Sequence, residues 1–152
     1  MTFSSRNGTR GARQPGNGFL PRLINTWAAK RARAGKTFFG GTLALVLTTV
    51  GSRTGIERST PVTYFPGEDG TWLIVASAAG AAKNPSWYYN LAANPDRVRI
   101  ELDGHTYDVV AEQLHGDARA RAWRRISRES KLFANYQAKT DRQLPIIRLS
   151  PR

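Results

Sequence analysis

The feature that most constrains the fold is a series of short β-type runs that are separated by turn residues and show no repeated alternation with helices. Runs rich in branched and aromatic residues are typical of strands. The sequence predicts strands at 43–50, 60–65, 71–77, 97–102, 106–112 and 145–149. Because most of these runs are joined as hairpins, we expect a mainly β protein: a six-stranded, closed or split antiparallel barrel with peripheral helices.

Two of the connections have recognisable turn chemistry. "PGEDG" (66–70) is rich in turn residues, so Glu68 and Asp69 are interpreted as part of a turn rather than as a catalytic pair of carboxylates. "DGH" (103–105) lies between two alternating runs and predicts a β-hairpin.

Helices are expected around the strands. "NPSWYYNLAANP" (84–95) predicts a short helix with Asn84 as its N-cap and Pro85 at its first helical position. Asp117 is expected to cap a helix through "ARARAWRRISRES", and residues 133–140 are expected to continue as a helix. The apolar face of the helix after Asp117 consists of Ala118, Ala122, Trp123 and Ile126.

The chain is predicted to have three parts. Residues 1–18 are mostly Gly, Ser, Asn, Arg and Pro and are expected to form a disordered basic tail. Residues 19–36 are expected to form a basic amphipathic helix, and 37–152 to form the barrel domain. The apolar side of that helix either packs on the domain or touches an anionic membrane surface, and the two alternatives are compatible.

Charge and composition restrict the function. The net charge is +12 and no acidic residue precedes Glu57, which favours an anionic partner: a nucleic acid, a membrane surface or an anionic cofactor. The absence of cysteine excludes disulfides and thiol chemistry, and the two separated histidines argue against a metal site. No apolar run is long enough to span a bilayer and no signal peptide is evident, so a cytoplasmic location is expected.

The stretch "TTVGSRTGIERSTPV" (48–62) joins two predicted strands and has the chemistry of an anion site. Gly51 and Gly55 permit tight turning, and exposed N–H groups in such a turn attract anions. Ser52, Thr54 and the guanidinium groups of Arg53 and Arg58 add donors that match phosphate oxygens. From this stretch alone, a phosphate-binding hairpin and a surface hairpin with solvated arginines are about equally supported.

Three segments in order resemble the signature segments of the deazaflavin-dependent nitroreductase family. They are "LTTVGSRTGIERSTPV", "VASAAGAAKNPSWYYNLAANP" and "NYQAKTDRQLPII". The resemblance covers about residues 22–150. It implies a split β-barrel of the FMN-binding type and a reduced deazaflavin cofactor, coenzyme F420, which has a flavin-like ring, a phosphate and an oligoglutamate tail.

The resemblance also implies which residues contact the cofactor. The phosphate end would be held by Thr48, Ser52, Arg53, Thr54, Gly55 and Arg58. The ring would lie along Ala76, Ser77 and Ala78, although Ala78 stands where relatives often have a lysine. The wall of the groove would be formed by Lys83, Asn84, Pro85, Trp87, Tyr88 and Asn90.

The same resemblance implies a substrate pocket with few phenolic donors. Its expected residues are Trp27, Thr63, Ser130, Phe133 and Tyr136. Thr63, Ser130 and Phe133 stand at positions that look like tyrosines in nitroreducing relatives. We therefore expect poor reduction of nitroimidazoles, better turnover of quinones or activated enones, and a gain in nitroreduction from Phe133→Tyr.

The predicted reaction is hydride transfer from reduced F420 to an electrophilic small molecule: a quinone, an enone or a nitro compound. Ser77 is expected to hydrogen-bond the developing negative charge, and Tyr136 to close the pocket and relay a proton. The alternatives are a satisfied hydroxyl at the strand end for Ser77 and a packing aromatic for Tyr136. A homodimer is also expected, because such barrels often pair.

Two other functions are considered. A split-barrel reductase that binds FMN would keep the fold and change the cofactor. A nucleic-acid-binding module is suggested by the high pI and by "ARARAWRRISR", but the basic residues do not alternate with aromatics on a strand platform, so no specific nucleic acid is expected.

Overall fold

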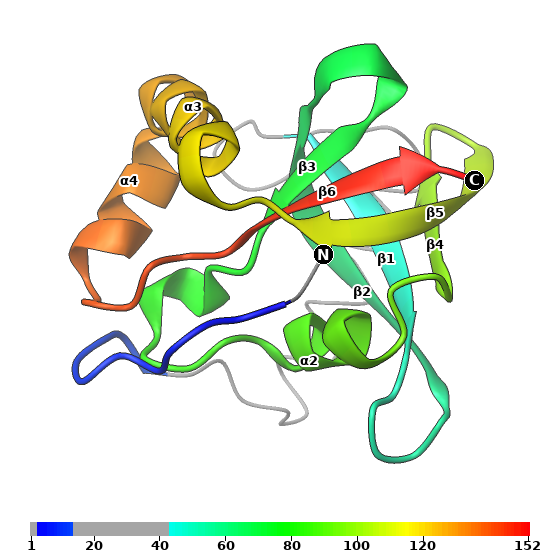
Figure 1. The fold of residues 1–152 in the computed structure, drawn as a ribbon, viewed down its shortest axis with the longest axis horizontal. Helices are drawn as coiled ribbons and strands as arrows, with labels where there is room; N and C mark the ends of the chain where they lie inside the picture. The colour runs from blue at the N-terminus through cyan, green and yellow to red at the C-terminus, as the bar shows by residue number, and fades with distance from the viewer. Residues whose placement is uncertain (1–2, 14–42) are drawn as a thin grey trace.

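The computed structural model describes residues 3–13 and 43–152, and its centre is a closed antiparallel barrel (Figure 1). The strands follow the order β1-β2-β3-β6-β5-β4 around the barrel, and β4 pairs back with β1. Their bounds are Ala44–Val50 (β1), Glu57–Pro66 (β2), Trp72–Val75 (β3), Val98–Leu102 (β4), His105–Gln113 (β5) and Ile146–Pro151 (β6). The expected six-stranded barrel with peripheral helices is confirmed.

Alternating side chains fill the inside of the barrel. Leu47 of β1 is paired in register with Ile100 of β4, and Ile74 of β3 with Ile147 of β6. All four side chains are fully buried in one cluster. Each contributes about 1.5–3 kcal/mol of hydrophobic stabilisation relative to an exposed side chain. The strand pattern of the sequence therefore also determines the core.

A second apolar cluster lies outside the barrel, under helices α3 (Gly116–Glu129) and α4 (Lys131–Ala138). These helices lie together on one side of the barrel, against β3 and β6 (Figure 1). Ile126 and Phe133 enter the cluster from the helices and meet Leu73 and Ile146 from the strands. Because both faces of β3 are covered, its sequence is almost entirely apolar.

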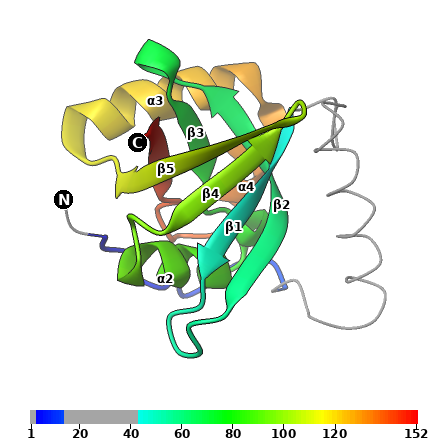
Figure 2. The ribbon, with the colours of Figure 1, turned by 90° about the vertical axis from the view of Figure 1, so that its right-hand side faces the viewer.

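Helix α2 (Ser86–Ala93) covers one end of the barrel, beside the β1–β2 hairpin (Figure 2). Leu91 and Tyr88 are buried in the inner cluster. Residues 68–70 form a short 3-10 turn with Asp69 at φ 55°, which confirms the turn interpretation of "PGEDG". The hairpin at "DGH" is also confirmed, between β4 and β5.

Both predicted helix caps are wrong. Pro85 is the N-cap of α2, and the side-chain oxygen of Asn84 instead accepts a hydrogen bond from buried Arg142. His115 is the N-cap of α3, without a capping hydrogen bond from its side chain, while Asp117 lies in the first turn. There its negative charge still interacts favourably with the helix dipole.

The first described residues differ from the expected disordered tail. Residues 3–13, which we call the N-terminal strap, run beside the segment before α2 (Figure 1). Gly8 N–H donates to the carbonyl of Ala82 at 2.7 Å, and Ala12 N–H donates to that of Gly80 at 2.9 Å. The polar composition of residues 3–13 does not predict this ordered pairing, because hydrogen bonds between main-chain groups require no apolar side chains.

Phe3 anchors the start of the strap, with its ring edge-to-face on Tyr88 at 5.7 Å. The predicted helix at 19–36 lies outside the described residues. Within the described part of the chain, no helix combines the length and the apolarity needed to cross a bilayer.

Candidate functional site

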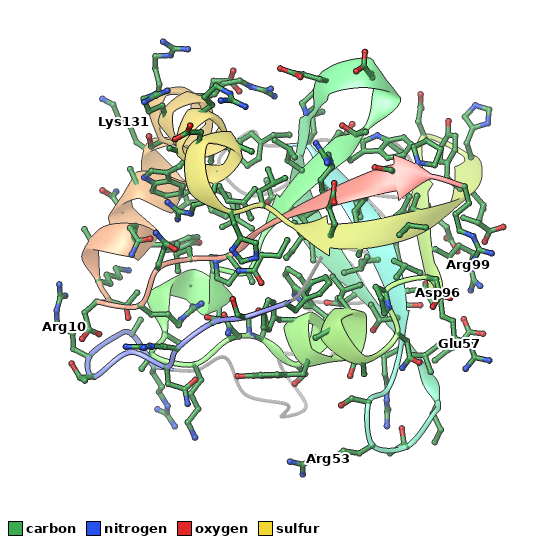
Figure 3. The ribbon with its side chains drawn as sticks, viewed as in Figure 1. Arg10, Arg53, Glu57, Asp96, Arg99 and Lys131 are labelled. Carbon is green, nitrogen blue, oxygen red and sulfur yellow. The ribbon has the colours of Figure 1, made fainter. Side chains whose placement is uncertain are left out.

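The loop between β1 and β2, which we call the 51–56 loop, is a closed turn with exposed polar side chains. Gly51 N–H donates to Ile56 O at 2.8 Å, and Gly55 N–H donates to Gly51 O at 2.9 Å. Gly55 has φ 70°, which a residue with a side chain adopts only with strain. Ser52, Arg53 and Thr54 are exposed at the tip, where Arg53 points away from the barrel (Figure 3).

Asn90 on α2 holds this loop in place. Its Nδ2 donates to Thr49 Oγ1 at 3.1 Å, and its Oδ1 accepts from Ser52 N–H at 3.0 Å. The side chain is 8 % exposed, so both ends of the amide are satisfied inside the protein. Asn90 therefore positions the loop, and its amide groups are already occupied.

Arg58 and Thr48, also predicted to contact the cofactor, lie on strands rather than in the loop. Arg58 belongs to β2, where it is exposed and pairs in register with Thr49, so the expectation that it lies in the loop is wrong. Thr48 is buried, and its hydroxyl hydrogen-bonds to that of Ser59 at 2.8 Å.

A second candidate segment follows β3 and is described as the 76–84 loop. Three consecutive residues, Ala78, Ala79 and Gly80, have positive φ angles of 45°, 56° and 83°. Two left-handed alanines in succession are strained, and such strain gathers at functional sites. A Cβ at Gly80 would lie 2.6 Å from the carbonyl oxygen of Tyr136, so only glycine fits between this loop and α4.

The turn leaves polar groups available. Gly80 N–H donates to Ser77 O at 2.8 Å, and Ala81 N–H donates to Ala78 O at 3.0 Å. Among the described residues, the N–H groups of Ala78 and Ala79 and the hydroxyl of Ser77 have no recorded hydrogen bond. Ser77 has αR geometry and Ala78 is left-handed, an arrangement in which successive N–H groups form an anion-binding concavity.

Arg142 is a functional candidate that the sequence interpretation missed. Its side chain is 2 % exposed and makes four hydrogen bonds, all to the 76–84 loop. Burial lowers the pKa of its guanidinium from the usual value. The available signal was a charged residue a few positions before a buried strand, within "NYQAKTDRQLPII".

Comparison with known proteins identifies the family. The family model of F420H(2)-dependent quinone reductases matches residues 22–151. An F420H(2)-dependent quinone reductase of Mycobacterium tuberculosis (strain H37Rv) is 37% identical over 123 residues, which are 79% of this chain and 81% of the relative. The chain belongs to the F420H(2)-dependent quinone reductase family.

Solved structures agree with this family. An F420-H2 dependent reductase has a TM-score of 0.63 and 33% identity, covering 70% of this chain and 93% of that chain. A structure described as a domain-swapped dimer has the same TM-score and identity, covering 70% of this chain and 79% of that chain.

For this quinone reductase family member, helix α2 connects the two candidate segments. Pro85, at its start, ends the 76–84 loop, and Asn90 holds the 51–56 loop. Lys83 is exposed beside the start of the helix, and Trp87 is half-buried against the core. Tyr88 points inward: its hydroxyl donates to Gln113 Oε1 at 2.7 Å, and burial raises its pKa to about 12.

The expected substrate-pocket residues have different surroundings within the described part of the chain. Phe133 is 4% exposed and packs edge-to-face on Phe65 at 5.5 Å. Ser130 caps α4, because its hydroxyl accepts from Phe133 N–H at 3.4 Å. Thr63 is half-buried on β2, and Trp27 lies outside the described residues.

Among the expected substrate-pocket residues, Tyr136 adjoins the 76–84 loop. It is half-buried, its ring meets Phe133 edge-to-face at 5.5 Å, and its carbonyl contacts the 76–84 loop at Gly80. Burial raises the pKa of the phenol from its usual value. Tyr136 is therefore protonated at neutral pH and adjoins the segment that contains Ser77.

A separate hollow of about 230 Å³ lies on the outer side of the β1–β4–β5 sheet. Its charged lining consists of Glu57, Asp96, Asp108, Arg97, Arg99 and Arg152. The Arg99 and Glu57 side chains form an ion pair at 3.2 Å (Figure 3). Three carboxylates offset three guanidinium groups there, so this hollow is a weaker anion site than the 51–56 loop.

Proposed function

We propose that this F420H2-dependent oxidoreductase reduces quinones, and that it binds reduced coenzyme F420 along helix α2 with the two candidate loops. The observation that carries the proposal is the connection of both loops by one helix, in a member of the quinone reductase family. When bound, reduced F420 supplies the hydride.

The 51–56 loop is proposed to hold the phosphate end. Ser52, Arg53 and Thr54 are exposed side by side, and Asn90 fixes the backbone that presents them. Arg58 adds a second guanidinium at the start of β2. The residues present fit an anionic group, because charge-assisted hydrogen bonds from guanidinium groups are worth about 1.5–3 kcal/mol each.

The 76–84 loop is proposed to bind the ring. The N–H groups of Ala78 and Ala79, which donate to no acceptor among residues 3–13 and 43–152, suit a carbonyl or an anionic oxygen, and the Ser77 hydroxyl provides a third donor. Neutral donors that are already oriented can stabilise developing negative charge. Tyr136, whose phenol carries its proton at neutral pH, is proposed to relay a proton to the reduced substrate.

The basic sequence of α3 gives little support to nucleic-acid binding. Arg119 turns inward, donating to Leu144 O at 2.9 Å and stacking on Trp123 at 5.3 Å. Arg125 donates to the carbonyl of Pro66 and forms an ion pair with Glu129 at 3.3 Å. Two of the five arginines of this helix therefore make contacts within the domain, which weakens the argument from charge for a polyanion site.

Three further properties are proposed from the sequence and the family: a cytoplasmic location, peripheral contact of residues 19–34 with anionic lipid, and a homodimer. Liposome flotation should show binding that requires anionic lipid and falls with salt. Equal flotation of full-length protein and a folded version lacking residues 1–34 would remove the membrane contact. Light scattering of the purified protein measures the oligomeric state.

The function is tested by titrating the purified protein with F420 and with FMN while following fluorescence. We expect F420 to bind and FMN to bind more weakly. Steady-state assays should then show loss of reduced F420 with a quinone, and slower loss with a nitroimidazole. Tight FMN binding without F420 binding, or vigorous nitroimidazole turnover without quinone turnover, would contradict the proposal.

A further inference from the structure

We infer that Arg142 is a positioning residue, which holds the 76–84 loop in the strained conformation that presents Ser77, Ala78 and Ala79 to the cofactor ring. The inference rests on the proposed function for the role of that loop. The hold on the loop itself is a property of the protein without cofactor, and it can be measured separately.

The contacts of Arg142 concentrate on one short segment. Its Nη1 donates to Ala76 O at 2.9 Å and to Asn84 Oδ1, its Nη2 donates to Ser77 O at 2.9 Å, and its Nε donates to Ala81 O at 3.1 Å. The four acceptors lie on both sides of the left-handed residues. One planar guanidinium therefore connects the beginning and the end of the loop.

The charge of Arg142 is unusual for its position. Within the described residues, this buried guanidinium takes part in no ion pair, and all its acceptors are neutral oxygens. Burying a charge without an ion-pair partner is strongly unfavourable. A rigid fork of donors is needed where several carbonyls must be held in fixed directions.

The loop has a specific need for such a hold. Ala78 and Ala79 both have left-handed backbone angles, which alanine adopts only when its surroundings enforce them. Ser77 O accepts from both Arg142 Nη2 and Gly80 N–H, so the guanidinium supports the turn at its first residue. Donation to the Ser77 carbonyl also polarises the Ser77–Ala78 peptide, which makes the Ala78 N–H a stronger donor.

Helix α4 places Arg142 and thereby connects it with Tyr136. Gln137 Nε2 donates to Arg142 O at 2.6 Å, and Gln137 Oε1 accepts from Leu144 N–H at 3.1 Å. Thr140 Oγ1 accepts from Arg142 N–H at 3.1 Å. The helix that carries the proposed proton donor thus also fixes the residue that shapes the ring-binding loop.

The first test uses apo protein and does not depend on activity. In Arg142→Lys, amide hydrogen exchange of Gly80 and Ala81 should become about tenfold faster or more, because a single ammonium cannot reach all four acceptors. The amide of Ile147, in the barrel, should exchange as in the wild type. Unchanged exchange at Gly80 and Ala81 would overturn the inference.

The second test measures what the loop does for the ligand. Arg142→Lys should weaken binding of oxidised F420 and lower kcat with saturating reduced F420, each by about tenfold. Ile126→Ala provides a matched control, because Ile126 of α3 is fully buried in the apolar cluster under α3 and α4, to which no residue of the 76–84 loop belongs. If the control, at equal thermal stability, loses binding and kcat to the same extent, Arg142 acts only through stability and the inference is wrong.

A rescue variant separates conformation from folding. Ala79→Gly removes the strain of the left-handed residue and should restore part of the F420 affinity of Arg142→Lys, with little effect in the wild type.

If Arg142→Lys does not fold, Asn84→Ala removes one of the four contacts and should still accelerate exchange at Gly80 and Ala81. Absence of rescue, or no acceleration in Asn84→Ala, would contradict the inference. If wild-type protein does not bind F420, the proposed function fails, while the exchange test still decides whether Arg142 holds the loop.

Discussion

Thr9 and Asp141 connect the N-terminal strap to the segment before β6. Thr9 N–H donates to Asp141 Oδ1 at 2.7 Å, and the Thr9 hydroxyl donates to Asp141 Oδ2. Asp141 directly precedes Arg142, and on the other side of it Thr140 Oγ1 donates to Arg10 O at 2.6 Å. The strap is therefore attached to the same few residues that support the 76–84 loop.

Strap binding is predicted to weaken in acid. The hydrogen bonds from Thr9 lower the pKa of Asp141 from 3.8 to about 2. Because the folded-state pKa is the lower one, the carboxylate contributes stability above about 3.8, and this contribution is lost as the pH falls towards about 2. NMR shifts of the Thr9 and Arg10 amides should change in that window and be insensitive to pH there in Asp141→Asn. Identical titration of both proteins would contradict the assignment.

Gly11→Ala is predicted to displace the strap. A Cβ at Gly11 would lie 2.6 Å from Ala82 N and 2.7 Å from Gly80 O, and these backbone atoms cannot move aside easily. Each lost hydrogen bond is worth about 1 kcal/mol, which lowers Tm by roughly 2–4 °C in a domain of this size. Tryptic cleavage after Arg10 and Arg13 should accelerate. Ser5→Ala, at an exposed strap residue, is the control and should leave both measurements unchanged.

Arg53→Ala and Arg58→Ala are each predicted to weaken F420 binding about tenfold or more, because each removes a charge-assisted contact of about 1.5–3 kcal/mol. Both side chains are exposed, so the Tm should stay close to that of the wild type. Arg124→Ala removes an equal charge from an exposed position on α3 and controls for general attraction of an anion. Wild-type affinity in both Arg53→Ala and Arg58→Ala, measured by fluorescence titration, would remove the phosphate assignment.

Phe133→Tyr is predicted to destabilise the protein and not to increase nitroreduction, contrary to the expectation from sequence. Phe133 lies between Phe65 and Tyr136, with ring centroids at 5.5 Å from each. Phe133 is 4% exposed, so an added hydroxyl would be buried among aromatic rings without a hydrogen-bond acceptor, at a cost of about 1–3 kcal/mol. Thermal unfolding and nitroimidazole assays check the two parts. A more active and equally stable variant would show that Phe133 borders the substrate.

The sequence by itself determined the β pattern and the family. Strand runs and hairpin turns were sufficient for the barrel, because alternation and turn chemistry are local properties. The cofactor class came from the resemblance of three ordered segments to a known family. Local signals were less reliable at the helix starts. Asn84 is a residue type that is common at helix N-caps, but its side-chain oxygen instead accepts a hydrogen bond from the distant guanidinium of Arg142.

Only the tertiary structure decided which polar residues are available. Arg142 and Asn84 are 58 positions apart, and Ser52 and Asn90 are 38 apart, so no local pattern predicts that they meet. The same holds for the strap, whose composition is typical of disorder but whose main chain pairs with Gly80 and Ala82. Closing the barrel and packing α2 and α4 on it bring these groups together, and the hydrogen bonds of a buried polar group depend on that packing rather than on its neighbours in sequence.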